Sequence, residues 1–201
     1  MLEVYFGEIQ SGHLEQVGYD TYCHLLDEVV KEMKGIQVEP EVELQIDLNV
    51  TSYIPDEYIA DANQKIEIYQ NIALCQNEEN IQNVIDEIID RFGNMPTEVE
   101  NLIAISRIKY LAKQLKISKI ASKNAGKKTA TVFTFEPNQF ELDITEIVKK
   151  YGNKIKFSAG IKPMITLEIG TDNERQILND VTEFLDVARC GEFGTGTKSP
   201  L

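Results

Sequence analysis

The spacing of apolar residues changes along this 201-residue chain, and this change most limits what the chain can fold into. Up to Leu115, apart from residues 39–50, apolar residues recur at intervals of three and four, which predicts helices. After Ser118 they alternate within short segments separated by glycines, which predicts strands with intervening helices. We therefore expect an α+β fold, with a helix-rich N-terminal half packed with a small mixed sheet formed largely by the C-terminal half.

The expected elements follow from these periods. Helices are expected at residues 11–34, 63–75, 80–92, 97–115, 142–151 and 173–188, and strands at residues 39–50, 118–123, 129–136, 154–159 and 164–169. The helix at 63–75 is expected to bury Ile66, Tyr69, Ile72 and Ala73. The helix at 80–92 is expected to bury Ile81, Val84, Ile85, Ile88, Ile89 and Phe92. The helix at 97–115 is expected to bury Val99, Leu102, Ile103, Ile105, Ile108, Leu111 and Leu115. The last of these should have a basic outer face, and Gly93 should cap the helix before it.

Charge is unevenly distributed along the sequence. The net charge of -13 opposes non-specific binding to DNA phosphates. From Glu39 to Glu100 the only basic residues are Lys65 and Arg91, whereas the stretch from Arg107 to Lys128 has eight basic residues and no acid. Two interpretations stay open: charged surfaces that face different partners, or ordinary solvated helix faces.

Residues for catalysis or metal binding are not arranged in any pattern that indicates a site. The three cysteines are far apart, which favours reduced thiols in the cytoplasm over a disulfide framework or zinc cluster. Cys23 and His24 are adjacent, so on a helix their side chains point about 100° apart. No glycine-rich loop with a correctly placed lysine is present to hold nucleotide phosphates. We expect no enzyme activity, no metal and no cofactor, and no membrane segment.

The basic stretch offers one alternative function. Arg107, Lys109, Lys113 and Lys116 are candidate phosphate contacts of an accessory DNA-binding module. Only Tyr110 supplies an aromatic ring there, which weakens an interpretation as a single-strand binding site. A solvated face or an acidic protein partner remain the other interpretations.

Two blocks of sequence resemble a known family. Ile54-Pro55-Asp56-Glu57-Tyr58-Ile59, Lys65 to Tyr69, and Glu87 to Pro96 followed by Val99 and Leu102 resemble the C-terminal domain of bacterial transcription-repair coupling factors, called Mfd. The resemblance runs from Pro40 to Ile117. Upstream, Gly7 to His13 with Val17 to Asp20 resembles the second half of the translocation motif that Mfd shares with RecG, and Gln10, Gly12 and His13 fall in this remnant.

The resemblance implies a parent protein that is an ATP-dependent DNA translocase, with ATP and Mg in motor domains outside this chain. Such proteins remove stalled RNA polymerase from DNA and recruit the repair protein UvrA. The implied role of this domain is autoinhibition: it lies against a UvrB-like N-terminal module of the same protein and masks the surface that UvrA would use. Residues 1–36 would be the motif remnant with a linking helix, residues 37–190 the regulatory domain, and residues 191–201 a disordered or engineered tail.

The family match also indicates which residues would make the inter-domain contact. Glu87, Asp90 and Arg91 lie near one face of their expected helix, since they are three and four positions apart. The alternative is an exposed Glu87–Arg91 pair worth about 0.3 to 0.5 kcal/mol within the helix. Ile54, Pro55, Tyr58 and Tyr69 also match, and we expect them to shape a turn and pack the core.

Overall fold

The computed structural model describes residues 44–125, 128–137 and 142–189, and it confirms the expected α+β fold. The helix expected at 11–34 and the residues Gln10, Gly12 and His13 lie outside these ranges. The chain divides into two compact units. The first contains residues 1–41 and 50–107, and the second contains residues 42–49 and 108–201.

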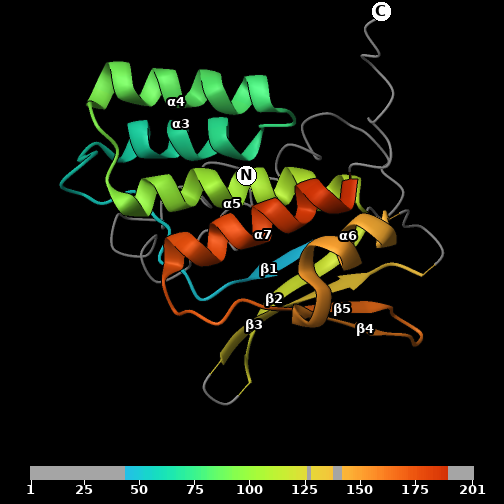
Figure 1. Cartoon of the computed structure of the whole chain (residues 1–201). Helices are drawn as coiled ribbons and strands as arrows, with labels where there is room; N and C mark the ends of the chain where they lie inside the picture. The colour runs from blue at the N-terminus through green and yellow to red at the C-terminus, as the bar shows by residue number, and fades with distance from the viewer. Residues whose placement is uncertain (1–43, 126–127, 138–141, 190–201) are drawn as a thin grey trace, which may run out of the picture. The chain divides into compact units, whose positions relative to one another are not determined.

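The first unit is helical. It contains α3 (Ala62–Ala73), α4 (Glu78–Phe92) and the first half of α5 (Thr97–Gln114). Figure 1 shows α3 and α4 side by side. The fully buried side chains of this unit are mostly aliphatic: Ile54, Ile59, Ile68, Ile72, Ile81, Ile88, Val99 and Leu102.

The turn before α3 is fixed by the residues that the sequence singles out there. The carbonyl of Pro55 accepts hydrogen bonds from the backbone N–H groups of Tyr58 and Ile59, both at 3.1 Å. The buried N–H of Ile54 donates to the Tyr69 hydroxyl at 2.8 Å, and the Tyr58 hydroxyl donates to the carbonyl of Gly93 at 2.8 Å. These contacts confirm that the four matched residues shape a turn and pack the core.

The expected buried face of α3 was wrong by part of a turn. The structure buries Lys65, Ile68, Tyr69 and Ile72, whereas Ile66 and Ala73 are only half-buried. The sequence permits either face, because apolar residues occur at both 66 and 68. The ion pair between Lys65 and Asp56 favours the observed face, because it holds the Lys65 side chain in a buried position.

The second unit is a five-stranded sheet with helices on it. The strands are β1 (Gln45–Asp47), β2 (Ile117–Ala125), β3 (Lys128–Phe135), β4 (Ile155–Ser158) and β5 (Met164–Glu168), in the order β1-β2-β3-β5-β4. The sheet is mixed, as expected, because β1 runs parallel to β2 while the other pairs are antiparallel. Within the described residues, the strand expected at 39–50 is short.

Helices α6 (Ile144–Tyr151) and α7 (Glu174–Arg189) lie over one face of this sheet (Figure 1). The core beneath them is aromatic at its centre. Phe133 of β3 stacks on Phe184 of α7 with ring centroids 4.3 Å apart. The centroid of the Tyr151 ring lies 5.8 Å from that of Phe184. Alternation along β3 places Phe133 and Phe135 on this covered face.

Helix α5 is buried on more sides than its sequence suggests. All seven residues expected on its apolar face, including Leu115 just beyond its end, are buried, but so are Asn101, Ser106 and Ala112. The Asn101 amide donates to the carbonyl of Thr51 at 2.8 Å, and the Ser106 hydroxyl donates to the carbonyl of Ile72 at 3.0 Å. The expected basic outer face is therefore wrong for most of the helix and holds only near its end, where Lys113 is exposed.

Tyr151 predicts how stability depends on alkaline pH. Its buried hydroxyl has no hydrogen-bond partner among the described residues, and burial, followed by the charges of Glu183, Asp180 and Asp186, raises its pKa above 10.0. Because the folded-state pKa is raised, this contribution to stability is complete below pH 10 and is lost as the pH rises further.

Replacing Tyr151 with Phe should keep the ring contact with Phe184 and reduce this alkaline loss. The expected result is a smaller drop in the free energy of unfolding between about pH 8 and about pH 11 than in the unmodified chain, measured by urea titration. An equal drop in both proteins would contradict this account of the hydroxyl.

Candidate docking surface on the helical unit

Helix α4 is capped at both ends by the residues that flank it. The Asn77 side chain accepts a hydrogen bond from the backbone N–H of Asn80 at 2.8 Å, which caps the N-terminus. Gly93 ends the helix with a φ of 83°, a conformation that glycine adopts without steric cost, and its N–H donates to the carbonyl of Ile89 at 3.0 Å. The helix therefore presents its side chains at fixed positions.

Arg91 ties α4 to α3. Its guanidinium donates to the Glu87 carboxylate at 2.5 Å, four residues back on α4, and to the Glu67 carboxylate of α3 at 3.0 Å. Glu87 also accepts from the Asn71 amide of α3 at 3.2 Å. The hydrogen bonds to Glu67 and then Glu87 raise the pKa of Arg91 above its usual value, so both partners favour the charged form.

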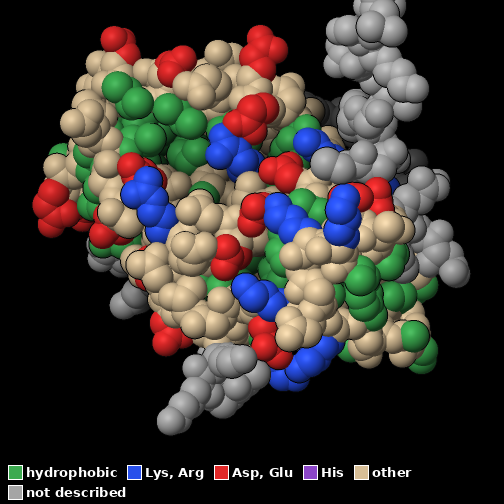
Figure 2. Space-filling model, in the orientation of Figure 1, with side chains coloured by type: hydrophobic (Ala, Val, Ile, Leu, Met, Phe, Trp, Pro, Cys, Tyr) green, Lys and Arg blue, Asp and Glu red, His purple; other side chains and the backbone are tan. Residues whose placement is uncertain are grey.

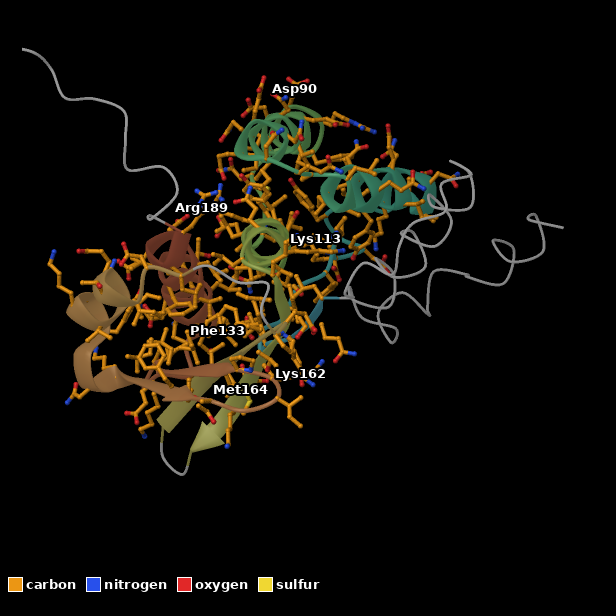
Figure 3. All side chains as sticks on the ribbon, turned by 90° about the vertical axis from the view of Figure 1, so that its right-hand side faces the viewer. Asp90, Lys113, Phe133, Lys162, Met164 and Arg189 are labelled. Atoms are coloured by element: carbon orange, nitrogen blue, oxygen red, sulfur yellow. The ribbon has the colours of Figure 1, made fainter. Side chains whose placement is uncertain are left out.

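The three residues predicted to make the inter-domain contact therefore differ in what they do. Glu87 and Arg91 form the expected pair, but it belongs to a network that joins two helices. Asp90 is exposed, forms no ion pair with any described residue, and lies on the outer side of α4 in Figure 3. Among the three, Asp90 is the carboxylate available to an outside partner.

An apolar side chain accompanies Asp90 on this outer surface. Ile89, which the helical pattern places in the core, is 46% exposed, and Asp86 is exposed three positions before it. Figure 2 shows acidic side chains along this side of α4. We call Asp86, Ile89 and Asp90 the α4 outer surface. Burying an isoleucine among carboxylates suits a partner with basic and apolar groups.

Sequence reasoning missed three contributors to this site. Glu67 and Asn71 were missed because their contacts with α4 are tertiary. Ile89 was assigned to the core because a continuous apolar stripe is the usual sign of a buried face. A signal for its exposure was present, since acidic residues occur three positions before it and immediately after it.

The predicted phosphate-binding residues do not form one cluster. Arg107 belongs to the first unit, where its guanidinium forms two hydrogen bonds with the Glu78 carboxylate. Lys109, Lys113 and Lys116 belong to the second unit. On α5 itself, Arg107 points about 200° away from Lys109, so the arginine faces another side of the helix.

Metal-binding side chains are not clustered in the described residues. No group of three or more His, Cys, Asp or Glu side chains that could hold a metal ion occurs among them. Cys75 is half-buried and its thiol donates to the Asn71 carbonyl at 3.3 Å, while burial raises its pKa and so disfavours the reactive thiolate. In the same ranges, no helix is long and apolar enough to cross a membrane.

Comparisons with known proteins point to one family. The model of the TRCF domain matches residues 48–147. A transcription-repair-coupling factor of Staphylococcus haemolyticus (strain JCSC1435) is 40% identical over 121 residues, and one of Staphylococcus aureus (strain USA300) is 41% identical over 120 residues. Each match covers 58% of this chain and 10% of the relative, so the chain spans about a tenth of the length of these relatives.

The fold has a solved counterpart. A crystal structure of the C-terminal domain of a transcription-repair coupling factor superposes with a TM-score of 0.59 at 22% sequence identity. The superposition covers 75% of this chain and 95% of that structure, which shows that the fold is shared.

Fold and site together define a two-unit α+β domain whose helical unit carries an acidic, partly apolar surface suited to protein contact. Within this class, residues 48–147 belong to the TRCF domain family, the domain of transcription-repair coupling factors.

The N-terminal cap of α4 gives a direct test of how its surface is held. Asn77→Ala removes the acceptor for the Asn80 N–H and should lower the free energy of unfolding by about 1 kcal/mol. Asn77→Asp, which keeps an acceptor, is the matched control and should cost little. Urea denaturation followed by circular dichroism measures both, and equal losses in the two variants would contradict the capping role.

Proposed function

We propose that this chain is a non-catalytic regulatory domain of a transcription-repair coupling factor, working in the cytoplasm through protein contact. The observation that carries the proposal is the α4 outer surface, where Asp90 and the half-exposed Ile89 are available while Glu87 and Arg91 are engaged. A surface of this composition suits a contact that is specific and also releasable.

The partner in this proposal is a UvrB-like N-terminal module of the same parent protein. By occupying that module, the domain masks the surface that UvrA uses, so that repair recruitment waits for a change in the parent protein. RNA polymerase, DNA and ATP are engaged by other parts of that protein. The relatives of matching sequence are named as coupling factors, and this supports the family context of the proposal.

Within the contact, the network of Arg91 has a positioning role. Glu67 and Glu87 hold the guanidinium between α3 and α4, and this fixes the helix that presents Asp90. The pairs are exposed, so their worth lies in orientation and not in large stabilisation.

Calorimetric titration of the chain against the isolated N-terminal module tests the proposal. Saturable binding should weaken by about tenfold in Asp90→Arg, because a charge at the contact is reversed, and UvrA should compete for the module. Glu57→Arg, which makes the same charge change on the turn before α3, is the matched control and should bind normally. Binding that is insensitive to Asp90→Arg would exclude the α4 outer surface as the contact.

DNA binding by the end of α5 is the second candidate. It is supported by exposed Lys113 and Lys116 in a unit with 15 basic and 13 acidic residues, whereas the first unit has five basic and 20 acidic residues. Duplex DNA at low ionic strength should then be retarded by the unmodified chain and released by added salt. The double variant Lys113→Glu, Lys116→Glu should lose this binding, and no retardation of the unmodified chain at low salt would eliminate the candidate.

A further inference from the structure

Exposed apolar side chains are concentrated in one part of the second unit. Seven large apolar side chains are exposed in the described residues, and five of them fall between positions 144 and 164: Ile144, Val148, Phe157, Ile161 and Met164. Figure 2 shows hydrophobic side chains gathered over α6 and the β4–β5 hairpin. Because large apolar groups on a soluble protein are usually scattered, such a concentration indicates a binding surface.

Four of these side chains are compatible with one continuous surface. Ile144 and Val148 are four residues apart, so they lie on the same side of α6. Phe157 pairs in register with the buried Ile165, so it points to the sheet face that the helices cover, yet it is 47% exposed. Ile161, in the turn between β4 and β5, is 92% exposed. Met164 alternates to the opposite face and is not included.

Strand β4 is also an edge. The sheet order ends at β4, whose outer side pairs with no described strand. An edge strand offers a row of backbone donors and acceptors that an extended segment can use. Lysines protect such edges from aggregation, and Lys156 fits that role. The neighbouring Phe157 is half-exposed and does not protect the edge in this way.

A lysine-rich stretch borders this surface in a chain that is acidic overall. From Lys149 to Lys162 there are five lysines and no acidic residue. Four of these lysines form ion pairs with residues elsewhere in the sequence, at Nζ–O distances of 2.7 to 3.3 Å. Their side chains are 39 to 73% exposed, so each pair is weak and can be exchanged for an incoming carboxylate.

The opposite edge of the same sheet gives an example of an added strand with one buried and one exposed side. There β1 adds a strand in which Ile46 is buried while Gln45 and Asp47 are exposed. This short strand covers the core with Ile46 and places an amide and a carboxylate on its exposed side.

We propose that the outer edge of β4, together with α6, binds an extended acidic segment of another protein as an added strand. Apolar residues of that segment would cover Phe157 and Val148, and its carboxylates, on the other side, would face Lys156. A single-stranded nucleic acid is a poorer fit, because Phe157 is the only aromatic side chain among the four exposed apolar ones. This inference is independent of the docking role proposed for α4.

The probe is a fluorescein-labelled peptide of alternating glutamate and valine, seven residues long and acetylated and amidated at its ends, added to the full chain at low salt. Fluorescence anisotropy should show saturable binding that weakens with salt. Binding should fall by about tenfold in Phe157→Thr and in Lys156→Glu. Lys119→Glu, the same charge change at an exposed position of β2, is the matched control and should bind normally.

Each contrary result identifies a different failure. No saturable binding to the unmodified chain, or equal binding of a lysine–valine peptide, overturns the proposal. So does an oligothymidylate that displaces the peptide and binds more tightly, since the surface would then serve nucleic acid. Self-association that Phe157→Thr abolishes, seen by analytical ultracentrifugation, would assign the surface to a second copy. Lys156→Glu keeps the test decisive if Phe157→Thr does not fold.

Discussion

Burial of helix α5 on most of its sides is the constraint on which the other elements depend. Its first half supplies Val99, Leu102 and Ile103 to the helical unit, and its second half supplies Ile108, Leu111 and Ala112 to the unit that contains the sheet. Its buried side chains are spread around most of the helix axis, so each unit must cover its own half on several sides. The polar residues within it are tolerated because Asn101 and Ser106 donate to backbone carbonyls.

The two units differ in chemistry as well as in fold. The sequence of the helical unit has 20 acidic and five basic residues. The basic residues that the structure describes in this unit all pair within it: Lys65 with Asp56, Arg91 with Glu67 and Glu87, and Arg107 with Glu78. Carboxylates therefore dominate its surface. The sheet unit has nearly balanced charge and exposes lysines beside apolar side chains. Surfaces of such different character suit different partners.

Periodicity predicted most of the fold because it reports directly which residues are buried. The expected helices and strands in the described ranges agree with the structure to within a few residues, with the short β1 as the exception. Periodicity failed where a tertiary partner decides between alternatives, as at Ile66 and Ile68 in α3, where Lys65 pairs with Asp56. It also failed on α5, where the first half of the helix exposes Thr97 and Glu100 and only its end exposes a lysine.

The contacts around the α4 outer surface were predictable only where the two partners are close in sequence. The Glu87–Arg91 pair follows from their four-residue spacing, but the bond from Arg91 to Glu67 joins residues 24 apart and has no local signal. The pairing of Arg107 with Glu78, on another helix, likewise has no local signal in the basic stretch. In the sequence, all charged residues from 149 to 162 are lysines. This stretch became of interest only because the structure exposes Phe157 and Ile161 within it.

In the proposed function, the chain acts through the outer surface of α4. Amide hydrogen exchange of the chain, measured with and without the UvrB-like N-terminal module, tests it most directly, because it reports where a partner lies without altering any residue. Contact through this surface should slow exchange in α4, most strongly around Asp86 to Asp90, and leave the β4–β5 hairpin unchanged. Protection confined to the hairpin, or none at saturating module, would contradict it.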